Sequence, residues 1–75
     1  MIMEINEERS QPIIKLGQFM KWQNLVQSGG EAKIRIQGGE VMVNGDIETR
    51  RGRKLVTGDV VTFNGKSYAV NLESG

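Results

Sequence analysis

Hydrophobic residues follow a helical period in the first part of the chain. From Leu16 to Val26 they recur at spacings of three and four residues, which predicts an amphipathic helix. Its apolar stripe consists of Leu16, Phe19, Met20, Trp22 and Val26. Because the two aromatic residues share this stripe with aliphatic ones, we interpret Trp22 and Phe19 as core residues and not as a platform for stacking bases.

Glycine pairs divide the helical part of the chain. The run QSGG at 27–30 is expected to end the first helix through a left-handed glycine cap. A second, short helix is predicted over 31–37, where Ser28 and Glu31 have the spacing of a capping box. Gly38-Gly39 is expected to end it. Neither pair follows a strand with the spacing of a phosphate-binding loop, so we interpret both as helix termini.

After residue 40 the hydrophobic period changes to two. Alternating residues predict strands at 41–43, 60–63 and 66–72, and the dipeptides Asn44-Gly45 and Asn64-Gly65 predict tight hairpin turns. The predicted fold is therefore α+β, with two packed N-terminal helices followed by a small, mostly antiparallel sheet.

The 75 residues are enough for one small domain. Residues 1–11 show little periodicity and precede the only proline, so we expect an N-terminal tail followed by a domain over 12–75. The chain contains no cysteine and no histidine, which excludes thiolate metal sites and most nucleophile-plus-base mechanisms. We expect no cofactor and no enzyme activity. With no apolar run near the roughly 20 residues of a membrane span, we expect a cytoplasmic protein.

Positive charge is concentrated in the middle of the chain. The net charge is +1, but residues 15–54 carry eight basic and four acidic side chains. Four of the cations form the cluster Arg50, Arg51, Arg53 and Lys54, interrupted only by Gly52. Two interpretations remain open: a solvated loop whose charges pair with Glu48, or a site for phosphate groups, which arginine binds with paired hydrogen bonds.

The chain from Leu16 to Val61 resembles the alpha-L motif, the small RNA-binding domain named after ribosomal protein S4, and in particular its short, stand-alone bacterial members. The resemblance depends on the sequences EAK at 31–33, EVMVNG at 40–45 and RRGRKLVTGDVV at 50–61. Each is weak alone, but the three together at this spacing are specific.

The resemblance implies that the two helices and the following hairpin form one positive face that docks on structured RNA. Carried over to this chain, the RNA-binding residues are Lys15, Lys21, Lys33, Arg35, Arg50, Arg51, Arg53 and Lys54. Two positions depart from the family pattern. Ser28-Gly29-Gly30 replaces a basic inter-helix turn, which leaves only backbone N–H groups there, and Arg35 replaces a small or apolar residue.

The expected function is that of a monomeric module that recognises the shape and phosphates of ribosomal or transfer RNA, without reading bases, in ribosome assembly or quality control. Its expected partners are structured RNA and the ribosome or its precursors. One alternative is an adaptor whose basic loop meets an acidic protein. A remote alternative is a ubiquitin-like sulfur carrier, although the C-terminal residues are Glu73-Ser74-Gly75 and lack the required Gly-Gly.

Overall fold

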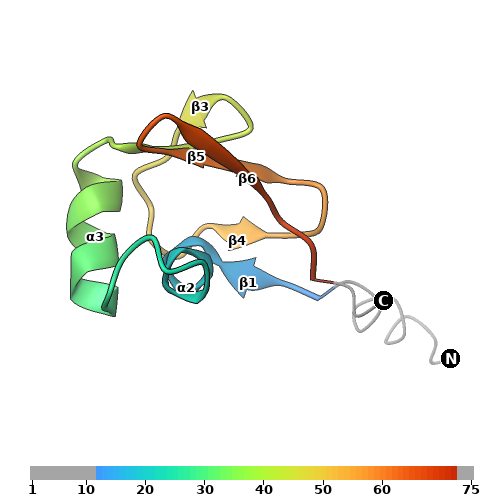
Figure 1. The fold of residues 1–75 in the computed structure, drawn as a ribbon, viewed down its shortest axis with the longest axis horizontal. Helices are drawn as coiled ribbons and strands as arrows, with labels where there is room; N and C mark the ends of the chain where they lie inside the picture. The colour runs from blue at the N-terminus through green and yellow to red at the C-terminus, as the bar shows by residue number, and fades with distance from the viewer. Residues whose placement is uncertain (1–11, 73–75) are drawn as a thin grey trace, which may run out of the picture.

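The computed structural model describes residues 12–72, and it confirms the predicted α+β fold with the helices before the sheet (Figure 1). The predicted tail, 1–11, lies outside the described residues. The elements in chain order are β1 (Ile14–Lys15), α2 (Leu16–Trp22), α3 (Gly29–Gln37), β2 (Val41–Val43), β3 (Asp46–Ile47), β4 (Lys54–Leu55), β5 (Val60–Phe63) and β6 (Lys66–Ala69).

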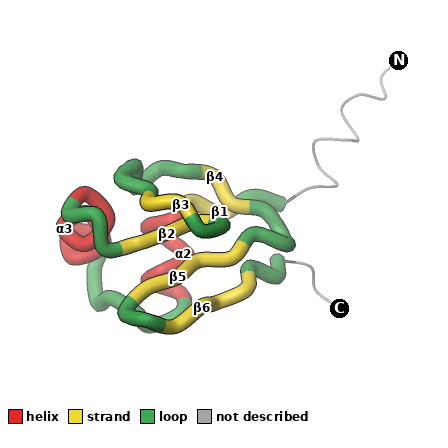
Figure 2. The backbone as a smooth tube through the Cα atoms, turned by 90° about the horizontal axis from the view of Figure 1, so that it is seen from above, coloured by secondary structure: helices red, strands yellow, loops and turns green. Residues whose placement is uncertain are grey.

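The strands form two small antiparallel sheets. β3, β2, β5 and β6 lie side by side in that order, and β1 pairs separately with β4 (Figure 2). Both predicted hairpins are present. Asn44 and Asn64 have φ angles of 52° and 58°, and the glycine after each also has positive φ, as a two-residue type I′ turn requires.

The core lies between the four-stranded sheet on one side and α2 with the β1–β4 pair on the other, and α3 closes one end (Figure 1). Fully buried side chains come from both helices and from the strands β2, β4 and β5: Leu16, Phe19, Met20, Ala32, Ile36, Val41, Val43, Leu55 and Val61. The two central strands, β2 and β5, each bury alternate residues, as a sheet with one covered face requires. Within 12–72, neither helix has the length and apolar character needed to cross a membrane.

The first helix is shorter than its hydrophobic stripe predicted. It ends at Trp22 and not at Val26, because Asn24 adopts a left-handed conformation with φ of 60°. The N–H of Asn24 donates to the Lys21 carbonyl at 3.0 Å, and the N–H of Leu25 donates to the Met20 carbonyl at 2.9 Å. This is the hydrogen-bond pattern of a Schellman cap, with asparagine in the position that glycine usually takes.

Two predictions that depended on the longer helix are wrong. Gly29-Gly30 does not end the first helix; these residues are the first two of α3. Trp22 is not in the core, since 66% of its surface is exposed, whereas Phe19 is buried as expected. Once the helix has ended, Leu25 and Val26 from the connection pack against the core, and Trp22 remains outside.

The start of α3 carries the predicted capping interaction in a modified form. The Ser28 hydroxyl accepts a hydrogen bond from the N–H of Glu31 at 3.1 Å. The Glu31 carboxylate in turn accepts a hydrogen bond at 2.8 Å from the N–H of Gln27, one residue before the cap. This arrangement fixes where α3 begins, and Gly38 caps its other end.

Candidate RNA interface

The basic loop, residues Arg50–Lys54, is attached to the start of α2 through its backbone. The N–H of Leu16 donates to the Arg53 carbonyl at 2.8 Å, and the N–H of Gly17 donates to the Arg51 carbonyl at 3.0 Å. No side chain caps α2, so the loop carbonyls satisfy two of its free N–H groups. Pairing of β1 with β4 continues this contact and fixes the loop beside the helix.

A buried carboxylate orders two arginines of the basic loop. Glu48 accepts hydrogen bonds from the backbone N–H of Arg50 at 3.0 Å, from Arg50 Nε at 2.9 Å and Nη2 at 3.2 Å, and from Arg53 Nη1 at 2.8 Å. These bonds, from Arg50 first and Arg53 second, lower the pKa of Glu48 from 4.5 to about 2. Glu48 is therefore ionised at neutral pH and holds both guanidinium groups in place.

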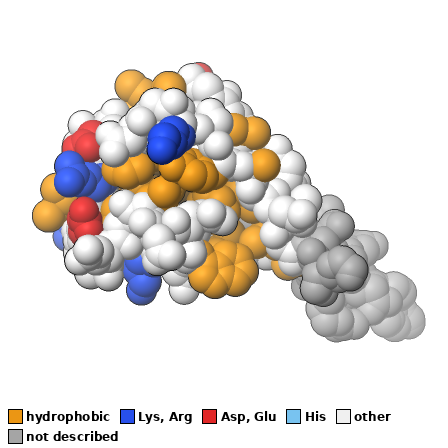
Figure 3. Space-filling model, in the orientation of Figure 1, with side chains coloured by type: hydrophobic (Ala, Val, Ile, Leu, Met, Phe, Trp, Pro, Cys, Tyr) orange, Lys and Arg blue, Asp and Glu red, His pale blue; other side chains and the backbone are white. Residues whose placement is uncertain are grey.

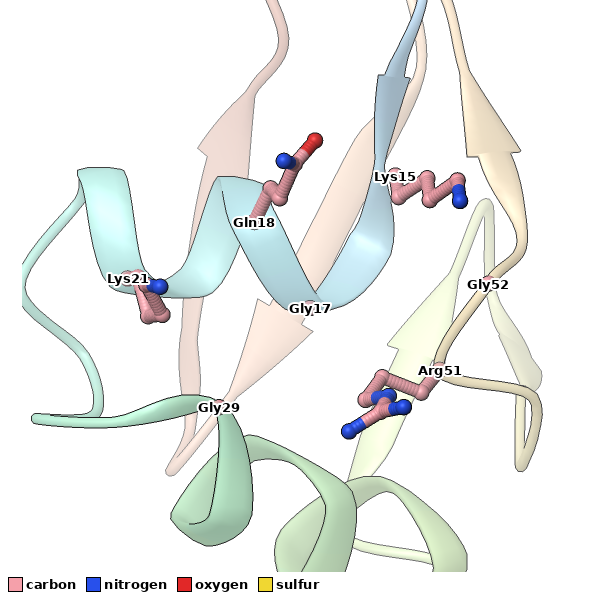
Figure 4. Close-up of a pocket in the computed structure, with 7 residues that line it drawn as sticks. All are labelled: Lys15, Gly17, Gln18, Lys21, Gly29, Arg51 and Gly52. Atoms are coloured by element: carbon pink, nitrogen blue, oxygen red, sulfur yellow. The ribbon is translucent and has the colours of Figure 1, made fainter.

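The remaining arginine of the loop, Arg51, meets two lysines in a hollow between the helices. This basic pocket has a volume of about 300 Å³ (Figure 4). Its lining comes from β1, α2, the first residue of α3 and the basic loop, and consists of Lys15, Gly17, Gln18, Lys21, Gly29, Arg51 and Gly52. The lining contains three cations and no carboxylate, so it is a local concentration of positive charge.

Glycines make this convergence possible. A Cβ atom on Gly17 would lie 2.7 Å from Cγ of Arg51, so only glycine at this position leaves room for the arginine side chain. Gly29 brings the start of α3 to the pocket without a side chain. The free N–H groups at the start of a helix favour an anion, which adds to the effect of the three cations.

A second hollow, of about 470 Å³, shares Gly52 with the basic pocket and is lined by Arg50, Gly52, Arg53 and Lys54. Because β1 and β4 are antiparallel, Lys54 is directly opposite Lys15 of the basic pocket. Like charges in this position repel each other and destabilise the pair of strands. Together the two hollows form what we call the composite basic face.

Lys33 and Arg35, also expected to contact RNA, are not among the residues that line these hollows. Lys33 is exposed on α3. Arg35 Nη1 lies 3.3 Å from Glu40 Oε1, beyond the end of α3, and its Nη2 lies 3.7 Å from Glu31 Oε2 on the same helix, so its charge is paired. On the face shown in Figure 3, basic side chains are scattered and some lie beside acidic ones.

Several residues of the site have no clear signature in the sequence. Gly17, Gln18 and Gly29 line the basic pocket, but a glycine or glutamine in a helix carries no charge pattern. Glu48 was already one candidate partner for the charges of the basic loop, since it precedes Arg50 by two positions and Arg53 by five, and the structure shows both pairs. Its spacing was consistent with an ion pair but did not indicate burial.

The chain matches a family model and is similar to known bacterial proteins. The model of the family described as "S4 domain" matches residues 6–71. The "Probable ribosome maturation protein RlbA" of Bacillus subtilis is 51% identical over 53 residues, which cover 71% of this chain and 75% of that protein. The "Putative RNA-binding protein YbcJ" of Escherichia coli is 41% identical over 59 residues, covering 79% of this chain and 84% of that protein.

Proposed function

The chain belongs to the S4 domain family, and from this premise we propose that it is an RNA-binding protein that docks on structured RNA through the composite basic face. The RNA is ribosomal or transfer RNA, and the process is ribosome assembly or quality control. The names of the two relatives, one a probable ribosome maturation protein and the other a putative RNA-binding protein, support RNA binding and a role in ribosome assembly.

The observation that carries the proposal is the meeting of Lys15, Lys21 and Arg51 in one pocket. The three residues come from separate segments, and none of them forms an ion pair with another described residue. Cations held together without a counter-charge repel each other, so the arrangement contributes to function through an anionic partner and not through stability. A phosphate group has the charge and size for such a pocket.

The second hollow extends the same chemistry along the basic loop. Arg50 and Arg53 keep part of their donor capacity after pairing with Glu48, because a guanidinium has five N–H donors. Lys54 is exposed beside them. Two hollows that share Gly52 can take successive phosphates of one strand, which is how a protein recognises the shape of an RNA.

The test is the salt dependence of RNA binding by the purified protein. Each phosphate neutralised by a cation releases counterions, so affinity for ribosomal RNA fragments falls steeply with salt. Substitution of Lys15, Lys21 or Arg51 by Gln is expected to weaken binding and to reduce the slope of log K against log salt by about 1 for each residue. All three side chains are on exposed residues, so the fold is retained.

Lys66→Gln is the matched control, since it removes one charge from β6, outside the two basic hollows. Equal effects of Lys66→Gln and Lys21→Gln would mean that only the overall charge matters, and the proposal would be rejected. Co-sedimentation with ribosomal particles that survives ribonuclease treatment would instead favour an acidic protein as the partner of the basic loop.

A further inference from the structure

Trp22 is the only tryptophan of the chain, and it lies on the surface next to the basic pocket. It lines a third hollow, of about 390 Å³, together with Ile14, Gln18 and Lys21. Gln18 and Lys21 also line the basic pocket, so the two hollows are adjacent. Hydrophobic side chains are visible on the surface over α2 and β1 in Figure 3.

The exposure of Trp22 has no structural benefit within the described chain. A domain of this size depends on its few large apolar side chains, and both phenylalanines are buried, with exposed fractions of 1% and 6%. Trp22 instead exposes 66% of its surface at the last turn of α2. A large exposed aromatic side chain beside concentrated charge is typical of a binding surface.

We propose that the RNA bound by this site carries an unpaired nucleotide, and that its base stacks on the indole ring of Trp22 while its phosphate enters the basic pocket. This inference rests on the proposed function and specifies it: the preferred RNA has a bulge or loop beside the docked phosphates and is not a continuous duplex. Trp22 then supplies the base-stacking platform that the hydrophobic stripe alone did not predict.

The arrangement on α2 fits one nucleotide. Gln18, Lys21 and Trp22 are three and four residues apart, so they lie on the same side of the helix. Lys21 lines both hollows, so its ammonium group can contact the phosphate that follows the stacked base. The amide of Gln18, which has both donors and an acceptor, is available to the edge of the base (Figure 4).

The positive charge around the hollow beside Trp22 favours a nucleotide base over an apolar protein segment as its occupant. The hollow is not purely apolar, because Lys21 and Gln18 form half of its lining and Lys15 and Arg51 lie in the adjoining pocket. A nucleotide satisfies both parts of this surface, since it has a flat aromatic base joined to an anionic phosphate. An apolar peptide would leave the cations without partners.

The experiment compares two RNA probes, a fully paired hairpin and the same hairpin with one bulged adenosine. Because Trp22 is the only tryptophan, its fluorescence reports on this position alone. We expect quenching by the bulged hairpin and tighter binding of it than of the paired one. Trp22→Ala should remove that preference, with a loss of about tenfold for the bulged probe, and should leave binding of the paired probe and its salt slope unchanged.

Two further variants separate stacking from folding and from general hydrophobicity. Trp22→Phe keeps a ring and should retain most of the preference. Ile34→Ala removes a side chain of similar exposure, 69%, which lies on α3 and does not line the hollow. It should change neither the affinity for the bulged hairpin nor that for the paired one. Circular dichroism during heating checks that each variant is folded.

The results distinguish this proposal from the proposed function. Salt-sensitive binding of both probes with equal affinity, and no quenching, would overturn the stacking proposal alone. Failure of both probes to bind would overturn the proposed function as well. If Trp22→Ala leaves RNA affinity intact but abolishes association with ribosomal particles, the occupant of this hollow is a protein, and the stacking proposal is wrong.

Discussion

The N–H of Gly17 donates a hydrogen bond to the carbonyl oxygen of Arg51 at 3.0 Å, and the side chain of Arg51 occupies the space where a larger residue 17 would place its Cβ. The start of α2 and the basic loop are therefore in close contact at Gly17 and Arg51. The position of Arg51 in the basic pocket depends on a residue that has no side chain.

Gly17→Ala is expected to weaken RNA binding by moving Arg51. The new Cβ would lie 2.7 Å from Cγ and 3.2 Å from Cδ of the arginine, so its side chain must rotate away from the pocket. A several-fold loss of affinity, comparable to that of Arg51→Ala, is expected. The double variant decides the cause: if Gly17→Ala acts through Arg51, adding Arg51→Ala lowers the affinity little further, whereas additive losses would show an independent effect.

Glu48→Gln is expected to destabilise the protein by about 2 kcal/mol at neutral pH, because hydrogen bonds between a buried carboxylate and two arginines are replaced by weaker ones. Urea unfolding measures the difference. A stability equal to that of the unmodified protein would mean that the basic loop is ordered without this carboxylate.

The same residue gives a pH dependence of defined sign. The pKa of Glu48 in the folded state is about 2, below its ordinary value of 4.5, so the ionised form is favoured by folding. Its contribution is complete above about pH 4.5 and is lost as the pH falls toward 2. The stability difference between the unmodified protein and Glu48→Gln should therefore shrink over this range. Asp59, whose pKa is also lowered, mainly by its hydrogen bond from Val56, is present in both proteins and cancels.

Lys54→Thr is expected to make the protein more stable and a weaker RNA binder. Lys54 and Lys15 are directly opposite in the β1–β4 pair, and removing one of two facing like charges gains about 0.5 kcal/mol. Threonine also favours a strand. Thermal unfolding measures the stability, and an RNA titration of the same sample measures the affinity. A loss of stability would show that the two ammonium groups do not repel each other in the free protein.

Arg35→Gln is expected to change RNA affinity by less than about twofold. Its guanidinium is paired with Glu40 and Glu31, and an exposed pair of this kind contributes little to stability. Lys21→Gln, which removes an unpaired charge from the basic pocket, is the comparison. Similar losses of RNA affinity in the two variants would show that the RNA-binding surface extends along α3.

The parts of the fold that could be predicted from the sequence are those specified by a few neighbouring residues, such as the hairpin turns. An Asn-Gly dipeptide between alternating residues requires two positive φ angles, and both hairpins formed where this signal occurs. The end of the first helix has no such signal. The stripe from Leu16 to Val26 is compatible with a longer helix, whereas in the structure Asn24 is left-handed and Leu25 and Val26 pack against the core from the connection that follows.

The candidate site also has some features that the sequence predicted and others that it did not. Its charge was visible in the sequence, because the cations of the basic loop are neighbours in the chain. The convergence of Lys15, Lys21 and Arg51 was implied only by the family resemblance and by no pattern in the chain, because Lys15 and Arg51 are brought together by strands of two residues each, too short to show a period. The exposure of Trp22 also depends on where the helix stops, and the sequence pattern placed that point four residues too late.

The hydrogen bonds of Glu48 also affect the entropy of binding. An arginine side chain that is unrestrained in the free protein loses conformational freedom when it binds a phosphate, at an entropic cost of roughly 0.5–1.5 kcal/mol. Arg50 and Arg53 are restrained by the carboxylate before any RNA arrives, so much of this loss accompanies folding and not association. The basic loop is therefore preorganised, and under the proposed function this raises its affinity for RNA phosphates.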